Sequence, residues 1–153
     1  MQSIKADPQI HLASIKKIAG EPVTELTHPG TYKLSVRYGN SHSINDIPPS
    51  TARILVGLGM NLVLDPSVPF LPADAFLSFA QRKMAGRQGQ INAAIHTALP
   101  AEFSGTMEFQ VITTGQGIST ATVNFLISNN NPDFILMDET FNNNSAAVAY
   151  TVK

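Results

Sequence analysis

The 153-residue sequence contains no cysteine and no tryptophan. Without cysteine there are no disulfides, thiolate metal sites, iron–sulfur clusters or cysteine nucleophiles. Only 14 % of the residues are charged, against roughly 25 % in an average globular domain. No apolar run approaches the roughly eighteen residues that a membrane helix needs, so we expect no membrane insertion.

The sequence also lacks an excess of charge of either sign, because its ten Lys and Arg residues nearly balance its eleven Asp and Glu residues. Nucleic-acid-binding domains usually carry a strong positive field, so we expect no nucleic-acid partner. The length predicts a single domain over residues 1–153. Residues 1–5 lack the basic and then apolar pattern of a signal peptide. The chain is therefore either a complete intracellular protein or a module excised from a larger exported one, and the motifs described below favour the excised module.

Apolar residues alternate with polar ones in residues 32–38, 107–111, 121–127 and 146–152. A period of two puts one row of apolar side chains on the buried face of a strand. Residues 10–18 and 91–95 are weaker strand candidates, and residues 54–64 predict one strand bent at its glycines. Gly, Pro and Asn clusters between these runs predict turns. Together they predict an all-β fold, an antiparallel Ig-like β-sandwich with Greek-key connections.

The alternation also identifies a core. The inward residues that we predict are Tyr32, Leu34, Val36, Ile54, Val56, Phe109, Val111, Val123, Phe125, Val148 and Tyr150. Ala121 and Ile127 share the parity of Val123 and Phe125, so they should also point inward.

Residues 72–85 break the alternation. Phe76, Phe79 and Met84 follow helical spacing after Pro72, and Gly86 could end a helix. We therefore predict one short inserted helix or a long loop around residues 65–89. The alternative for this segment is an irregular loop with one more strand, in which Leu77 and Phe79 point inward.

Catalytic and cofactor motifs are absent from the sequence. No two of the four histidines, His11, His28, His42 and His96, are spaced as metal ligands, which favours ordinary sheet or turn roles. Residues 115–117, Gly-Gln-Gly, lack the Lys and the helix of a phosphate loop and predict a hairpin instead. We therefore predict no catalytic, cofactor-binding or metal-binding residue, no cofactor and no enzymatic activity.

The Asn-rich segment 129–144 admits two interpretations, a calcium site or turn formation. Its oxygen donors suit a hard cation: Asp133, Asp138, Glu139, Asn129, Asn131, Asn142, Asn143 and Asn144. The spacing does not match an EF-hand loop, and Asn also favours left-handed turns for backbone reasons. We therefore favour turn formation.

One small basic cluster consists of Arg82, Lys83 and Arg87. Beside Phe76 and Phe79 it could contact an anion or an acidic polymer. Three cations are too few for a nucleic-acid footprint, so a solvated surface is the favoured interpretation. A sugar-stacking platform is disfavoured because Trp is absent and the other aromatic residues mostly occupy inward positions.

Several short motifs follow one another in a recognisable order. They are residues 10–12, the Pro-Gly turn at 29–30, the strand 31–40 ending in Gly-Asn, the Ser/Thr/Ala-rich entry at 50–56, the Leu-Pro turn at 99–105, and the Asn-rich closure at 132–152. In this order the chain resembles the Ig-like conserved-repeat modules of bacterial surface proteins, which are related to bacterial cell-adhesion sandwiches. Two departures are a missing Gly after Asn40 and a long insertion at 65–89.

The resemblance implies a non-catalytic structural or adhesive module of a bacterial cell-surface or secreted protein, serving as a stalk segment or an adhesin repeat. It implies an extracellular location at the cell surface. It implies neighbouring modules of the parent protein as partners, together with a surface glycan or protein ligand. The alternatives are a carbohydrate-binding accessory module and a structural protein of a phage or fibre.

Overall fold

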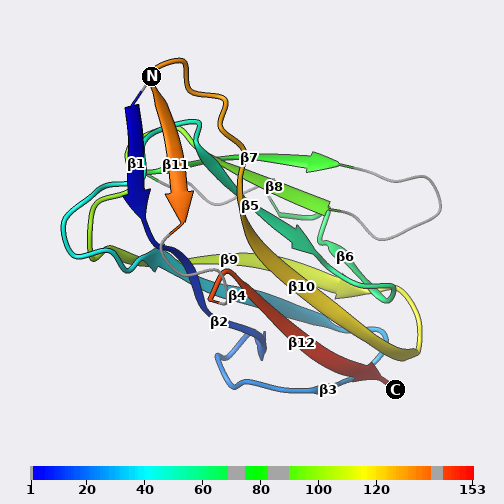
Figure 1. Ribbon diagram of the computed structural model, residues 1–153. Coiled ribbons are helices and arrows are strands. Elements are labelled where there is room, and N and C mark those ends of the chain that lie inside the picture. Colours follow the sequence, from blue (N-terminus) through cyan, green and yellow to red (C-terminus); the bar gives the residue numbers. More distant parts are fainter. Residues whose placement is uncertain (1, 69–74, 83–89, 139–142) are drawn as a thin grey trace.

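The computed structural model describes residues 2–68, 75–82, 90–138 and 143–153, and all regular structure within them is strand (Figure 1). The strands are β1 (Gln2–Ala6), β2 (Pro8–Lys17), β3 (Glu25–Leu26), β4 (Thr31–Asn40), β5 (Ala52–Gly57), β6 (Leu62–Leu64), β7 (Leu77–Arg82), β8 (Gln90–Ile95), β9 (Ser104–Thr113), β10 (Gly117–Ile127), β11 (Phe134–Asp138) and β12 (Ser145–Val152).

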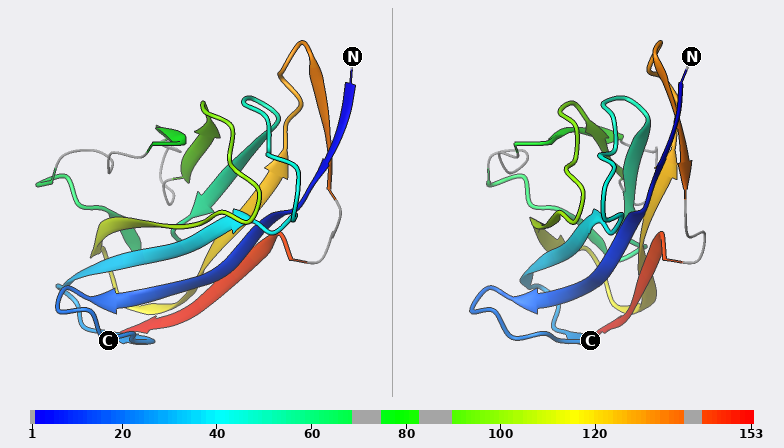
Figure 2. Two further views of the ribbon diagram at one scale, coloured as in Figure 1. Left: turned by 90° about the vertical axis from the view of Figure 1, so that its left-hand side faces the viewer. Right: turned by 60° about the vertical axis from the view of Figure 1, so that its left-hand side comes forward.

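Two of the three sheets form a sandwich (Figures 1 and 2). The six-stranded sheet has the order β3-β12-β10-β5-β8-β7, and the four-stranded sheet has the order β2-β4-β9-β6. Strands that follow one another along the chain, such as β4 and β5 or β8 and β9, lie in opposite sheets. The predicted all-β, Ig-like sandwich is confirmed. The pairing is not wholly antiparallel, because β3 runs parallel to β12 and β1 runs parallel to β11.

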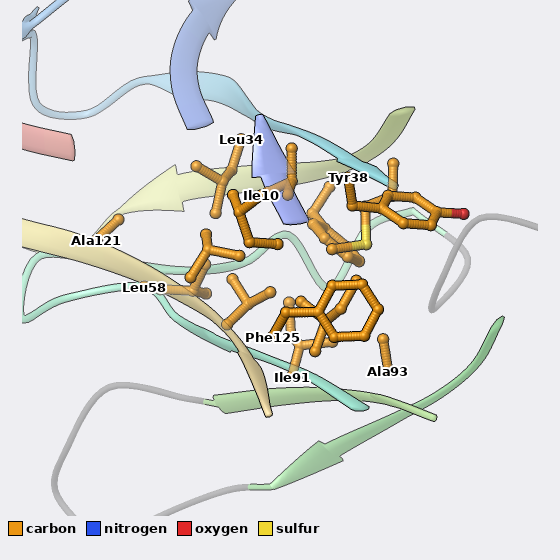
Figure 3. Close-up of a cluster of buried hydrophobic side chains, with 14 of the residues drawn as sticks. Ile10, Leu34, Tyr38, Leu58, Ile91, Ala93, Ala121 and Phe125 are labelled. Carbon is orange, nitrogen blue, oxygen red and sulfur yellow. The ribbon is translucent and has the colours of Figure 1, made fainter. Parts of the chain in front are cut away.

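The core lies between the two large sheets (Figure 3). All eleven residues predicted to point inward are buried, and Figure 3 shows Leu34 and Phe125 facing it from opposite sheets. The period of two places Ala121, Val123 and Phe125 on the inner face of β10. Ile127 is a correction, since it is 39 % exposed. It is the last residue of β10 and pairs with Ala52, the first residue of β5, so it lies at the margin of the paired region.

The apolar run 54–64 is not one bent strand, as the sequence suggested. It forms β5 in the six-stranded sheet and β6 in the four-stranded sheet, joined by a corner. Gly59 lies in this corner with φ +85°, and a Cβ there would come within 2.9 Å of the carbonyl oxygen of Thr120. The Tyr150 hydroxyl donates to the carbonyl of Leu58 at 3.0 Å, which ties the corner to β12. The glycine therefore permits a change of sheet.

The predicted helix over residues 72–85 is wrong for its described part. Residues 77–82 form β7, which pairs antiparallel with β8, and the rest of the helix segment lies outside the described residues. Leu77 is buried, and the Phe79 ring meets the Phe109 ring edge-on at 5.7 Å between centroids. Pairing with β8 and inward packing at a period of two override the helical spacing. The additional strand of the alternative interpretation, with Leu77 and Phe79 pointing inward, is confirmed.

The Gly-rich turn at 115–117 also differs from its prediction. It does not close a hairpin, because β9 and β10, which it joins, belong to different sheets. Gly117, at φ +139°, provides the backbone conformation for this crossing. The turn signal in the sequence therefore located the loop correctly, but it did not show that the two strands joined by the loop lie in different sheets.

Strands β1 and β11 form a small parallel sheet that we call the arm. It runs from the sandwich toward the N-terminal end of the molecule (Figure 2). Leu136 on its inner face is 2 % exposed, whereas Ile135 and Met137 on its outer face are 37 % and 47 % exposed. Strand β11 separates Asp133 from Asp138 by its full length, and neither β1 nor β3 was predicted from the sequence.

Candidate functional site

Several buried or half-buried polar residues are hydrogen-bonded to one another where the arm joins the sandwich, a region that we call the junction. We define the junction by Asp7, Asn40, Asp138, Asn143 and Asn144. In the arm, Ala6 of β1 lies opposite Asp138 of β11. Asp7 follows β1, Asn40 ends β4, Asp138 ends β11, and Asn143 and Asn144 precede β12, so four distant parts of the chain meet here.

Asn40 is the hub of the junction and has no exposed surface. Its Oδ1 accepts hydrogen bonds from the main-chain N–H groups of Asp7 at 3.2 Å and His42 at 3.1 Å. Its Nδ2 donates to the carbonyl oxygens of Asn45 at 2.8 Å and Leu99 at 3.3 Å. A single amide side chain therefore holds the start of β2 against two loops.

Two carboxylate–amide pairs complete the junction. Asn143 Nδ2 donates to Asp7 Oδ1 at 3.0 Å, and Asn144 Nδ2 donates to Asp138 Oδ2. The main-chain carbonyls of the same asparagines accept from Ile10 at 3.0 Å and from Phe125 at 2.7 Å. These bonds join the approach to β12 to β2 and to β10. Both carboxylates are buried, so the amide donors stabilise charge that water solvates poorly there.

The oxygen donors considered for a calcium site in segment 129–144 do not lie together in the structure. Asn129 Oδ1 accepts from the Leu136 N–H at 3.0 Å, and Asn131 Oδ1 accepts from the Asp133 N–H at 2.8 Å. The Asn131 bond shapes the turn that precedes β11, and the Asn129 bond supplies an acceptor to a main-chain N–H group of β11. Both asparagines therefore support local backbone structure, as the turn interpretation expects. Asp133 and Asp138 stand at opposite ends of β11, about 16 Å apart at the usual rise of a strand. Glu139 and Asn142 lie outside the described residues.

The junction supplies only oxygen donors, the type that hard cations prefer. Asn143 Oδ1 and Asn144 Oδ1 are buried without a hydrogen-bond partner. Against this, residues 2–68, 75–82, 90–138 and 143–153 contain no group of three or more His, Cys, Asp or Glu side chains placed to hold a metal. The observed chemistry is amide donation to carboxylates. Asp7 was missed from the sequence, where the Asp-Pro dipeptide at 7–8 was its only signal.

The four histidines are dispersed. His11 lies in β2 as expected, and burial lowers its pKa, with Arg37 acting in the same direction and Asp7 opposing. His28 Nδ1 is 2.8 Å from Thr113 Oγ1 beside the β3–β4 connection. His42 lies in the loop that follows β4, and His96 lies just beyond β8.

The basic cluster proposed near residue 82 is mostly outside the described residues. Lys83 and Arg87 are not described, and only the main chain of Arg82, within β7, is. The neighbouring Phe76 ring packs on the Phe103 ring at 4.6 Å between centroids, so it faces inward. Where the structure describes a Phe or Tyr, that residue is buried or half-buried.

Comparisons with known proteins support the fold and go no further. No family model matches the sequence, and no curated protein matches it. The CARDB domain of a Pyrococcus furiosus protein, solved in complex with di-metal ions, matches 96 % of this chain over 93 % of its own length, with 13 % identity and a TM-score of 0.53. A cohesin module from a Clostridium perfringens family 33 glycoside hydrolase matches 97 % of this chain over 96 % of its own, with 9 % identity and a TM-score of 0.52.

These likenesses confirm a sandwich of the CARDB and cohesin type. Membership of the surface-repeat family resembled by the sequence stays a prediction. The described part of the chain has no helix able to cross a membrane.

Proposed function

We propose that this chain is a non-catalytic module of a bacterial cell-surface or secreted protein, acting as a stalk segment or an adhesive unit. The observation that carries the proposal is the match, over nearly the whole chain, to a cohesin sandwich that is itself one module of a larger enzyme. The partners that we propose are neighbouring modules of the same parent protein, with a surface glycan or protein as ligand.

The positions of the chain ends support a stalk arrangement. The labels N and C lie at opposite ends of the molecule in both figures (Figures 1 and 2). Modules with ends at opposite poles can be joined end to end without the chain doubling back.

The use of polar side chains supports a non-catalytic role. The described junction residues bond main-chain groups or each other, and these bonds hold strands and loops together. A general acid, base or nucleophile would need a polar group directed at a substrate. The inward aromatic residues give no support to the carbohydrate-binding alternative.

Antibody access to intact cells tests the proposal. Antibodies raised against the purified domain should label unbroken cells of the source organism or detect the protein in the culture medium. The matched control is an antibody against a cytoplasmic protein, which should label only lysed cells. Detection of the domain solely after lysis would contradict the proposal.

A further inference from the structure

One histidine organises the loop at residues 41–46. His42 Nδ1 accepts hydrogen bonds from the main-chain N–H groups of Ile44 at 3.1 Å and Asn45 at 2.9 Å. A ring nitrogen can accept only while it carries no proton. The neutral imidazole must therefore carry its proton on Nε2 in this structure.

Loop 41–46 follows β4 and is hydrogen-bonded to β1 of the arm and to Asp7 just beyond it. Asn45 Nδ2 donates to the carbonyl oxygen of Lys5 at 3.0 Å, and the Ser41 N–H donates to that of Asp7 at 2.9 Å. On its other side, the Glu102 N–H donates to the carbonyl oxygen of His42 at 3.0 Å. The position of Asn45, set by His42 and Asn40, therefore decides whether Lys5 keeps its partner.

We propose that loop 41–46 is a proton-sensitive clasp on β1, closed while His42 is neutral and opened when its imidazole is protonated. An imidazolium has two N–H donors and no acceptor, so no ring orientation could serve the Ile44 and Asn45 amides. Histidine ordinarily changes charge between about pH 5 and 8. Acidification then frees the two amides, releases Asn45 from Lys5 and loosens the arm. This inference does not depend on the proposed function.

Within residues 2–68, 75–82, 90–138 and 143–153, charged residues hydrogen-bonded to loop 41–46 include Lys5 and Asp7 on the β1 side and Glu102 before β9, and Asp46 lies in the loop itself. Lys5, Asp7 and Glu102 meet the loop through main-chain atoms, and the Asp46 carboxylate accepts from the Ala101 N–H at 3.0 Å. These contacts do not replace the acceptor at Nδ1. Loss of that acceptor is therefore a direct consequence of protonating His42.

Two variants distinguish the effect of protonating His42 from a general effect of pH on the fold. In His42→Asn, the side-chain oxygen can accept from N–H groups two and three residues on, as asparagine does in turns, and it does not titrate. In His42→Ala there is no acceptor. Amide exchange by NMR, corrected for the intrinsic effect of pH, would be measured at pH 7.5 and pH 5 in all three proteins.

In the wild type, the protection factors of the Ile44 and Asn45 amides should fall about tenfold at pH 5, as expected for losing one hydrogen bond. They should stay high at both pH values in His42→Asn and low at both in His42→Ala. The Val56 amide in the sandwich serves as the internal control. If the wild type and His42→Asn show the same pH profile at residues 44 and 45, the clasp does not exist. If His42→Ala fails to fold, the comparison of the wild type with His42→Asn decides by itself.

Discussion

The sandwich and the arm are held together by different kinds of interaction. In the sandwich, side chains at a period of two fill a space between two sheets, and residues such as Leu34, Val56 and Val123 have no exposed surface. In the arm, two strands pair in isolation, and only one face is covered. Two-stranded sheets are marginal in water without further support. That support comes in part from burial of Ala6 and Leu136 against the core, and in part from asparagine side chains that bond main-chain groups at the arm and the junction.

This difference between sandwich and arm explains why the sequence pattern predicts the one and not the other. Burial of apolar area is non-directional, so its pattern is visible in the sequence as alternation. Side-chain to main-chain hydrogen bonds depend on contacts between residues far apart in sequence. The arm therefore depends on contacts that no local pattern records.

The largest effect should come from a charge placed in the sandwich core. Phe125→Asp would bury an unpaired carboxylate on the inner face of β10, where Phe125 is 1 % exposed, and should lower the free energy of unfolding by several kcal/mol. Asn124→Asp on the opposite face is the matched control and should cost much less. Urea denaturation measures both. If Asn124→Asp were the more damaging change, the assigned register of β10 would be wrong.

A smaller effect is expected at the hub of the junction. Asn40→Ala removes partners from two N–H groups and two carbonyl groups in a buried site, and should lower the free energy of unfolding by about 2–4 kcal/mol. Asn130→Ala, at an exposed residue of the Asn-rich turn, provides the control and should be near neutral. Equal melting temperatures for the two variants would show that the asparagine network does not support the sandwich.

A local effect is expected at the edge of β11. Asn129 has φ +42° and accepts from the Leu136 N–H, so Asn129→Gly keeps the backbone conformation and removes only the acceptor. Exchange of the Leu136 amide should quicken by a factor that corresponds to about 1 kcal/mol. Asn129→Asp retains an acceptor and should leave this exchange close to that of the wild type. Indistinguishable exchange in the Gly and Asp variants would remove Asn129 from the account of the arm.

The smallest effect concerns Asp65, in the turn after β6 and outside both the arm and the junction. Hydrogen bonds from the Ser67 side chain, the Gln110 side chain and the Ser67 main chain lower its pKa. A lowered carboxyl pKa stabilises the fold above the unfolded-state pKa, and this contribution is lost as pH falls through the folded-state value. Between pH 7 and pH 3, Asp65→Asn should therefore lose less stability than the wild type. Asp133→Asn, at an exposed residue, should follow the wild type.

The sequence predicts the sandwich well because alternation and burial coincide there. All eleven residues predicted to point inward are buried, including Tyr150, whose hydroxyl donates to the Leu58 carbonyl. It predicts strand partners poorly. Residues 54–64 suggested one strand because periodicity does not show a change of sheet. Residues 77–82 suggested a helix because Phe76, Phe79 and Met84 also fit a helical spacing, which does not reveal the pairing with β8. Within the junction, the sequence marked Asn40 only as the end of the strand 31–40, because its four hydrogen-bond partners include residues as distant in sequence as Leu99.

Amide hydrogen exchange on the unmodified protein tests the contrast between sandwich and arm most directly. With an apolar sandwich and a polar-bonded arm, Val56, Val123 and Phe109 should exchange only through global unfolding, with free energies that match denaturant unfolding. Ile4 and Leu136 should exchange through local opening at a lower free energy, independent of denaturant at low concentration. If the arm and sandwich amides exchanged with the same free energy and the same denaturant dependence, the two would be one cooperative unit and the contrast would be wrong.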